Sequence, residues 1–253
     1  MKDFADRAGV AVVTGGSGGL GEAVVRLLVE RGSRVVFTYR SNEATATKIA
    51  EDIGPDALPR RLDLTDAAAA QALLDEVGRD EGGVHTLVYA SGPHVPMTHL
   101  SRVGTDQFAD QINNDVLAFF HLTQAALPWL RRTGGSIVAV TTAATDRYPV
   151  RDGLSAVPKG AVEALVRGLA VEEGRYGIRA NSVGPGMLTD GMAVRLIANR
   201  DLDEVALEAA RRNTPLRRFG TATDIAEAVC FLASERAKFI SGQKLDVDGG
   251  YSV

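Results

Sequence analysis

Short apolar runs rich in valine alternate along the chain with longer segments in which apolar residues recur at helical spacing. This alternation is typical of βαβ units, in which helices connect parallel strands. Seven runs predict one doubly wound α/β domain with a seven-stranded parallel sheet over residues 1–253. The predicted strands are Val10–Thr14, Arg34–Tyr39, Leu58–Leu62, Thr86–Ala90, Ser136–Thr141, Arg179–Val183 and Lys244–Val247.

Two of the predicted helices are apolar on more than one face. The helices expected between the strands are Leu20–Arg31, Glu43–Ile53, Asp66–Arg79, Ile112–Leu130, Ala156–Glu173 and Thr223–Ala233. In Ile112–Leu130 and Ala156–Glu173 the apolar positions form more than one stripe, so each helix needs cover on both sides. The sheet covers one side, and a second subunit is expected to cover the other. The pattern therefore predicts a homodimer or homotetramer.

Composition narrows the class of protein. Of 253 residues, 45% are hydrophobic and 24% are charged, and the net charge is −4, which argues against nucleic acid as the main partner. Cys230 is the only cysteine, so no internal disulfide is possible. No apolar run reaches the ~18 residues of a membrane span. We expect a cytoplasmic enzyme with a small-molecule substrate, no membrane partner and no metal site.

A glycine-rich turn follows the first predicted strand and opens a helix. Glycines at such a turn let the backbone approach a pyrophosphate, which then binds the free N–H groups of the helix N-terminus. The spacing and the flanking elements make this a nucleotide site. Its expected contacts are Thr14, Gly15, Ser17, Gly19, Leu20 and Gly21.

The end of the second strand indicates which nicotinamide nucleotide binds. A site selective for NAD needs an acidic residue here to bind the ribose hydroxyls. Tyr39 occupies that position, and Arg40 and Ser41 follow it. A guanidinium can pair with a 2′-phosphate, so the sequence predicts NADP(H), although Arg40 could also be an exposed loop charge.

Several motifs together resemble the short-chain dehydrogenase/reductase family nearly end to end. They are the Thr-Gly-x-x-x-Gly-x-Gly turn, the run Asn181–Gly186, and Lys159 followed by Gly-Ala-Val-Glu-Ala-Leu; the segment from Thr214 to Gly250 resembles bacterial 3-oxoacyl-thioester reductases. The resemblance implies a Rossmann fold and further cofactor contacts. These are Asp63, Leu64, Ala90, Ser91, Gly92, Lys159, Pro185, Gly186, Leu188 and Thr189.

The same resemblance implies four catalytic positions, two of which hold a different residue in this chain. Asn114 matches the family asparagine, with Asn113 as a competitor, and Thr142 stands where a serine is usual. Lys159 matches the lysine of Tyr-x-x-x-Lys, but Ser155 replaces the tyrosine. An aliphatic hydroxyl is a poor general acid. Ser155 could instead cap a helix beginning near Ala156, because Pro158 belongs in a first turn.

One branch of the family, the dienoyl-CoA reductases, resembles this arrangement. Members of that branch have Ser-x-x-x-Lys with a tyrosine upstream, and they reduce a conjugated C=C bond. Tyr148 is an upstream tyrosine here and is either a relocated acid or a solvent-exposed side chain. The dienoyl-type tyrosine aligns with Ala144 if no gap is allowed.

These features predict an NADPH-dependent oxidoreductase that reduces a polarised C=C or C=O bond of a small apolar substrate, with thioesters among the candidates. A substrate lid is expected over residues 187–213. Two alternatives stay open: reduction of an imine or iminium, which needs no acid, and a non-catalytic NADP(H)-binding sensor or partner subunit.

Overall fold

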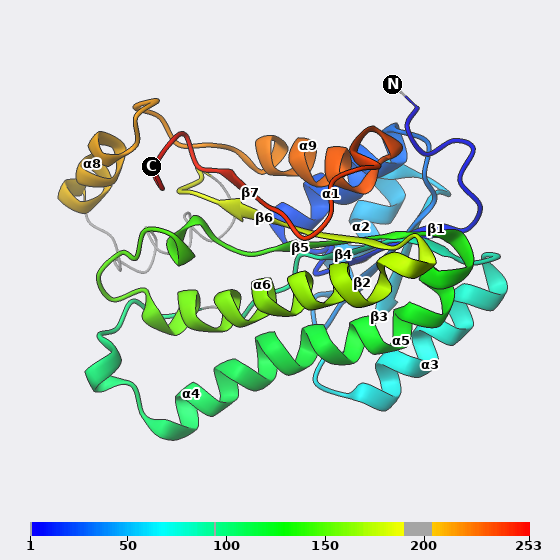
Figure 1. The fold of residues 1–253 in the computed structure, drawn as a ribbon, viewed down its shortest axis with the longest axis horizontal. Helices are drawn as coiled ribbons and strands as arrows, with labels where there is room; N and C mark the ends of the chain where they lie inside the picture. Colours follow the sequence, from blue (N-terminus) through cyan, green and yellow to red (C-terminus); the bar gives the residue numbers. More distant parts are fainter. Residues whose placement is uncertain (1, 94, 190–203) are drawn as a thin grey trace.

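A parallel seven-stranded sheet with the order β3-β2-β1-β4-β5-β6-β7 forms the centre of the computed structural model (Figure 1). The structure describes residues 2–93, 95–189 and 204–253. All neighbouring strands pair in parallel, as the alternating pattern predicted. The strands are β1 Val10–Thr14, β2 Val35–Tyr39, β3 Ala57–Arg61, β4 Val84–Tyr89, β5 Ser136–Val140, β6 Arg179–Pro185 and β7 Lys244–Val247.

The central strands β1, β4 and β5 are buried along their whole length. Successive strand residues point to opposite faces of a sheet. Thus Val12 and Tyr89 belong to the hydrophobic core on one face, and Val13 and Val88 belong to the core on the other. A strand that is buried on both faces has apolar residues at consecutive positions, so valine-rich runs in the sequence identified these strands.

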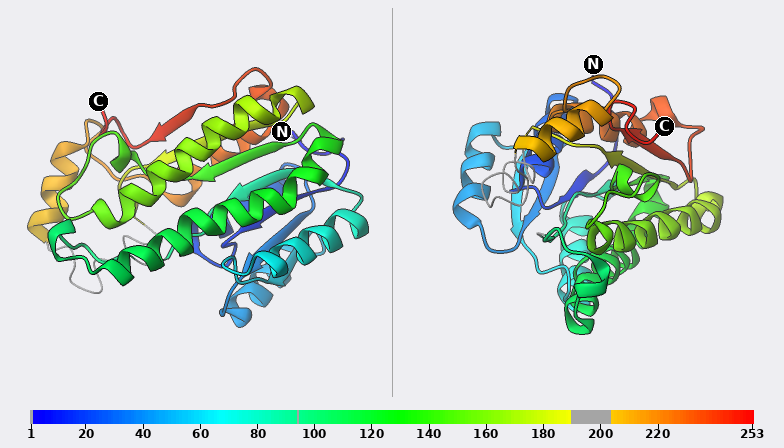
Figure 2. Two further views of the ribbon diagram at one scale, coloured as in Figure 1. Left: turned by 60° about the horizontal axis from the view of Figure 1, so that its bottom comes forward. Right: turned by 90° about the vertical axis from the view of Figure 1, so that its left-hand side faces the viewer.

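Helices cover both faces of the sheet (Figures 1 and 2). One core contains residues of α3, α5 and α6, and the other contains residues of α1, α2 and α9. The helices are α1 Gly19–Glu30, α2 Glu43–Ile53, α3 Ala67–Asp80, α4 Thr105–Ile112, α5 Ala118–Thr133, α6 Gly153–Glu173, α8 Glu204–Asn213 and α9 Ala222–Ala233. Short turns lie at η1 Leu100–Arg102, η2 Asn113–Leu117, η3 Ala143–Thr145, η4 Gly174–Tyr176 and η5 Glu235–Ala237.

Two predicted helices differ from those in the structure. The segment predicted as one helix from Ile112 is divided, because the π-helical turn η2 separates α4 from α5. Helix α6 begins at Gly153, so the expected cap at Ser155 is wrong. Its N-cap is Asp152, whose backbone oxygen accepts hydrogen bonds from the N–H groups of Ser155 (3.0 Å) and Ala156 (2.9 Å). The helix therefore starts early and holds Pro158 in its interior.

The carboxyl ends of the parallel strands meet at one edge of the sheet. Helix α8 and the first turns of α4 and α6 lie beyond the same edge (Figure 1). In open α/β sheets, ligands bind outside this edge. Among the helices of the described residues, none is long and apolar enough to span a membrane.

Candidate active site

The turn between β1 and α1 requires glycine at two positions. Gly15 has φ +68°, and a Cβ there would lie 2.8 Å from Ser91 Oγ and 2.9 Å from the backbone oxygen of Ala90. A Cβ at Gly21 would lie 2.1 Å from the backbone oxygen of Gly15. The N-cap of α1, Gly18, provides no side-chain cap. The first N–H groups of α1 therefore stay available to an anion such as pyrophosphate.

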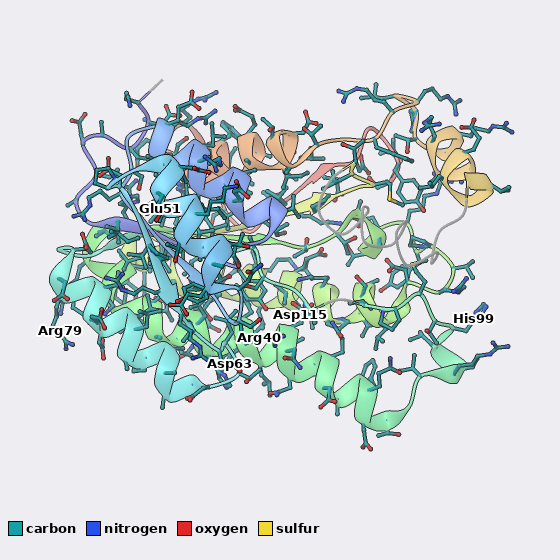
Figure 3. The ribbon with its side chains drawn as sticks, turned by 180° about the vertical axis from the view of Figure 1, so that it is seen from behind. Arg40, Glu51, Asp63, Arg79, His99 and Asp115 are labelled. Carbon is teal, nitrogen blue, oxygen red and sulfur yellow. The ribbon has the colours of Figure 1, made fainter. Side chains whose placement is uncertain are left out.

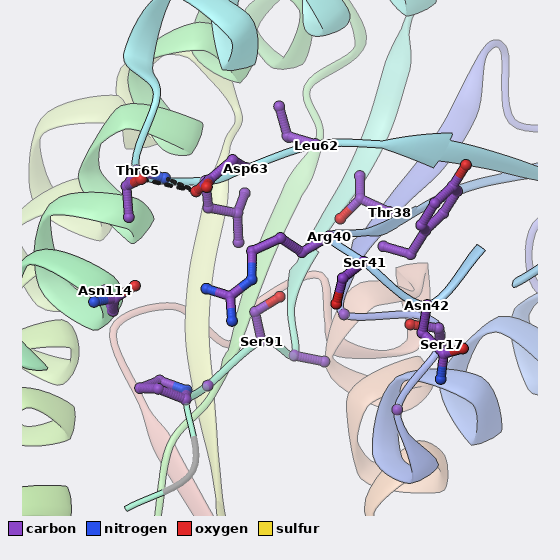
Figure 4. A pocket seen from close by; sticks show the side chains of 17 residues that line it. Ser17, Thr38, Arg40, Ser41, Asn42, Leu62, Asp63, Thr65, Ser91 and Asn114 are labelled. Atoms are coloured by element: carbon purple, nitrogen blue, oxygen red, sulfur yellow. Dashed lines mark hydrogen bonds between the residues drawn. The ribbon is translucent and has the colours of Figure 1, made fainter. Parts of the chain in front are cut away.

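A cleft of about 260 Å³ opens beside this turn (Figure 4). It is bounded by the carboxyl ends of β1, β2 and β4 and by the segment after β3. Ten of the nineteen cofactor contacts predicted from the sequence line this cleft. The lining residues are Gly15, Ser17, Gly18, Thr38, Tyr39, Arg40, Ser41, Asn42, Leu62, Asp63, Leu64, Thr65, Ala90, Ser91, Gly92, Pro93 and Asn114.

Arg40 and Asp63 both line the cleft, and in Figure 4 the Arg40 side chain lies between Asp63 and Ser91. The exposed Arg40 guanidinium forms no ion pair with any acidic residue that the structure describes. Asp63 Oδ1 accepts hydrogen bonds from the backbone N–H (3.0 Å) and Oγ1 (2.7 Å) of Thr65. These bonds, more than the nearby Arg40 charge, lower the pKa of Asp63. The α3 cap is Asp66, so Asp63 is not needed to start that helix.

Other predicted cofactor residues lie outside the cleft lining. Thr14 Oγ1 accepts a hydrogen bond from the backbone N–H of Ala90 (3.3 Å) and thereby ties β1 to β4. Gly19 and Leu20 form the first turn of α1. Gly21 lies in the same turn, and Lys159 lies on α6. Four more predicted residues lie at or after the end of β6: Pro185, Gly186, Leu188 and Thr189. The Thr189 N–H donates to the backbone oxygen of Gly220 (2.9 Å).

A buried ion pair lies beside the cleft. The ammonium of Lys159 donates a hydrogen bond to Asp115 Oδ1 at 2.8 Å, and the two side chains are 12% and 2% exposed. Lys159 Nζ also lies 3.5 Å from the backbone oxygen of Ser91, and 5.4 Å from the centre of the Tyr89 ring. The Tyr89 hydroxyl donates to the backbone oxygen of Asp115 at 3.1 Å. Burial, followed by the neighbouring Asp115 charge, raises the pKa of Tyr89 well above its ordinary value.

The sequence analysis did not identify Asp115 or Tyr89, two of the residues that contact Lys159. Asn114, the predicted catalytic asparagine, lines the cleft, but its amide nitrogen donates to the backbone oxygen of Asp110 (2.7 Å). Asp115 is the residue that reaches Lys159. Figure 3 shows Asp115 near Arg40 and Asp63, whereas Arg79 and His99 lie at the periphery. The sequence contained one indication of this role, because the acidic residue Asp115 stands among the apolar positions that precede Phe119.

The π-helical turn η2 explains why Asp115 faces inward. A π turn contains one more residue per hydrogen bond than an α turn, and π turns often occur at functional sites. Asp115 lies at the middle of Asn113–Leu117 and is 1% exposed. The family motif pointed to Asn114, and in the structure the buried side chain of this turn is that of the next residue, Asp115.

The three predicted hydroxyl groups have different surroundings. Thr142 is the N-cap of η3, and its Oγ1 accepts a hydrogen bond from the Ala144 N–H (3.1 Å). Ser155 is half-buried in the first turn of α6, one turn before Lys159. Tyr148 is 56% exposed. Exposure agrees with the surface interpretation of Tyr148 that the sequence left open.

The expected substrate lid lies partly outside the described residues. Of residues 187–213, the structure describes 187–189 and 204–213; the part between them, 190–203, is outside it. The described part contains Leu188, which pairs with Gly220 in an isolated bridge, and helix α8. Within the described ranges no group of three His, Cys, Asp or Glu side chains could hold a metal ion.

Known proteins share this fold and much of the sequence. The family model described as Enoyl-(Acyl carrier protein) reductase matches residues 15–252. The chain is 34% identical to cis-4-hydroxycyclohexanecarboxylate dehydrogenase of Sinomonas cyclohexanicum, over 99% of this chain and 98% of the relative. It is 32% identical to versicolorin reductase stcU of Emericella nidulans, over 95% of this chain and 94% of the relative.

Solved structures agree with these sequence relatives. A short-chain type dehydrogenase/reductase from Mycobacterium ulcerans superposes with a TM-score of 0.89 at 26% identity, covering 99% of this chain and 91% of that one. A blue fluorescent protein from a metagenomic library, in complex with NADPH, superposes with a TM-score of 0.88 at 30% identity, covering 99% of this chain and 100% of that one.

Proposed function

Because the chain belongs to the short-chain dehydrogenase/reductase family, we propose that it is an NADPH-dependent reductase of a polarised C=C or C=O bond. The substrate we propose is small and apolar, with a thioester as the first candidate. Oxidoreductase chemistry and a nicotinamide cofactor follow from the family. The choice of NADPH, the bond that is reduced and the substrate class are our inference.

The residues of the cleft fit a nicotinamide nucleotide. Close backbone approach at Gly15 and Gly21, together with the free N-terminus of α1, suits a pyrophosphate. A Cβ at Gly92 would lie 3.5 Å from Lys159 Nζ, so the ammonium lies next to a residue that lines the cleft. When bound, the reduced cofactor supplies the hydride.

Arg40 supports NADPH over NADH. The strand β2 ends at Tyr39, so no carboxylate is present there to bind the ribose hydroxyls. The Arg40 guanidinium points into the cleft and has no acidic partner among the described residues, which leaves its donors available to a 2′-phosphate (Figure 4). The solved relative in complex with NADPH has the same overall fold.

The proposal of catalysis rests on the Lys159–Asp115 pair. Removing two charges from water costs free energy that their attraction only partly returns, so a buried ion pair is poor evidence of a purely stabilising role. This pair lies next to Ser91 and Gly92, which line the cleft. A charged pair held at a ligand site is a functional arrangement. Asp115 orients the ammonium, and the Thr142 hydroxyl lies at the end of β5, on the same edge of the sheet.

We also propose that two or four copies assemble through α5 and α6. Leu117, at the end of η2, and Phe120 on α5 are 43% and 44% exposed, and Val171 on α6 is 83% exposed. Large apolar side chains left on two neighbouring helices favour cover by another subunit.

The proposed function is tested by following NADPH oxidation with three probes: an acetoacetyl thioester, a sorbyl thioester and the cyclic imine pyrroline. They present a C=O, a conjugated C=C and a C=N bond. We expect turnover of at least one thioester, and loss of that turnover in Lys159→Met. Turnover of pyrroline alone would favour imine reduction. NADPH binding without turnover of any probe would overturn the proposal in favour of a binding protein.

A further inference from the structure

The proposed reduction needs a proton, and the usual donor position holds Ser155. None of the described hydroxyl groups around Lys159 is a suitable acid. Thr142 and Ser155 are aliphatic hydroxyls, and Tyr148 is 56% exposed. Tyr89 is fully buried, its hydroxyl donates to Asp115, and its raised pKa disfavours proton loss. A reaction that adds hydride to a neutral C=C or C=O bond therefore takes its proton from a group other than these hydroxyls.

Asp152 is the N-cap of α6, at the position that extends the helix face carrying Ser155 and Lys159. Residues three and seven positions apart on a helix differ by about 60° and about 20° around the axis, and by about 4.5 Å and about 10.5 Å along it. Lys159 faces Asp115 and Ser91, so this stripe borders the active site. The half-buried Asp152 side chain makes no capping hydrogen bond although the residue is the N-cap of α6.

The residues on both sides of Asp152 are committed to other contacts. The Arg151 guanidinium donates to the backbone oxygen of Met97, at 2.6 and 3.0 Å. Gly153 packs so closely on Leu100 that a Cβ there would lie 2.7 Å from the leucine side chain. No described residue gives the Asp152 carboxyl a hydrogen bond or an ion pair. Because it contacts no described residue through a hydrogen bond or an ion pair, the Asp152 carboxyl is an acidic group on this stripe without a structural role.

We propose that Asp152 is the general acid of this active site, an inference that rests on the proposed reductase function. Hydride adds to the electrophilic carbon of the substrate, and the electron pair of the C=C or C=O bond moves to the other end of that bond. That atom takes the proton of the Asp152 carboxyl, whose O–H bonding pair stays on the carboxylate. Water then returns a proton to Asp152 before the next turnover.

The acidity of Asp152 suits this role. Burial raises the pKa of Asp152 to about 6, and no neighbouring charge adds to that shift. About a tenth of such carboxyl groups are protonated at neutral pH, and an acid works best when its pKa is near the working pH.

The titratable and charged groups on the elements packed against this end of α6 are His99, Arg102, Asp106, Asp110, Asp115, Asp146, Arg147, Arg151 and Lys159.

The main test compares Asp152→Asn with the wild type on whichever probe is reduced. Asp152→Asn removes the proton and keeps the shape, so we expect a ~100-fold loss in kcat/KM with unchanged NADPH affinity. Because the acid form is needed, wild-type kcat/KM should fall as pH rises through the pKa of about 6. This fall of kcat/KM with rising pH, the pH limb, should be absent in Asp152→Asn and present again in Asp152→Glu. A limb of the opposite sense would make Asp152 a carboxylate anchor for substrate and overturn the inference.

Asp246 offers a matched control. Burial also raises its pKa to about 6, but it lies on β7 beside Lys244, at 3.0 Å, and not on the α6 stripe. Asp246→Asn should therefore keep the pH limb. Carbon-13 NMR of the side-chain carboxyls gives a readout without substrate: one resonance titrating near pH 6 should vanish in Asp152→Asn, and a different one in Asp246→Asn.

The outcomes separate this inference from the proposed function. Turnover by the wild type with an unchanged rate and pH limb in Asp152→Asn removes Asp152 as the acid and leaves the reductase proposal standing. An Asp152 carboxyl that titrates near its ordinary value of about 4 also overturns the inference. Failure of the wild type to reduce any probe removes both.

Discussion

The ion pair between Lys159 and Asp115 predicts a large coupling energy. Asp115→Ala leaves the ammonium of Lys159, 12% exposed, without its carboxylate and with the Ser91 carbonyl at 3.5 Å as its remaining hydrogen-bond partner. Lys159→Met leaves a carboxylate that is 2% exposed. Breaking a buried pair by removing one partner costs about 3–5 kcal/mol. We expect about 3 kcal/mol for each single variant, at the lower end because Lys159 is not fully buried.

The double variant should cost much less than the sum, because it leaves no unpaired charge. We therefore expect a coupling energy of at least about 2 kcal/mol. Urea unfolding followed by circular dichroism, at one fixed protein concentration, measures each free energy of unfolding. In thermal scans each single variant should lose about 6–12 °C in Tm.

The exposed pair Arg212–Glu208 on α8 provides the control. Its N–O distance is 3.2 Å, and its side chains are 75% and 47% exposed. Solvent screens such a pair, so the same cycle there should give less than about 0.5 kcal/mol. A coupling energy below about 0.5 kcal/mol for Lys159 and Asp115 would refute the reasoning, because the buried pair would then behave like the exposed one.

Four further predictions follow from single features. Arg40→Ala should remove a preference for NADPH over NADH of at least ~10-fold, or about 1.4 kcal/mol, measured by calorimetry; equal wild-type affinities would contradict it. Tyr148→Phe should change kcat less than about threefold, because the side chain is 56% exposed; a ~100-fold loss would make Tyr148 the acid. Light scattering should show at least a dimer at micromolar concentration, weakened by Phe120→Glu, whereas a 26.7 kDa wild-type monomer would count against the assembly. Burial lowers the pKa of His85 to about 3. Below about pH 6.5 the unfolded chain therefore binds a proton at His85 that the folded protein does not bind. The free energy of unfolding should fall by up to about 1.4 kcal/mol for each pH unit of acidification in this range, and less steeply in His85→Asn.

The strands and the cofactor turn could be predicted from sequence because both are local patterns. Strands β1 and β7 have the predicted bounds, and the others differ by one to two residues at an end. Valine-rich runs mark strands buried on both faces. The glycine turn was equally readable, since the close approach of Gly15 to Ser91 leaves no room for a Cβ.

The partners of Lys159 could not be read in the same way. Tyr89 and Asp115 are 26 positions apart, and only the folded chain brings the hydroxyl within 3.1 Å of the backbone oxygen of Asp115. Asn114 was selected because it matches the family asparagine, whereas the residue that contacts Lys159 is its neighbour Asp115, inside the π turn. For α6, Pro158 suggested a later start, but the backbone oxygen of Asp152 supports an earlier first turn. Long-range contacts and irregular helical turns leave little trace in a single sequence.

The central claim is that this chain transfers hydride from NADPH to a small apolar substrate. The most direct test uses NADPH carrying two deuterium atoms on the reactive ring carbon, with the acetoacetyl and sorbyl thioesters as acceptors and mass spectrometry of the products. The account predicts one deuterium in the reduced product for each NADPH consumed. Products without deuterium, or stoichiometric NADPH binding with no consumption by either acceptor, would contradict it.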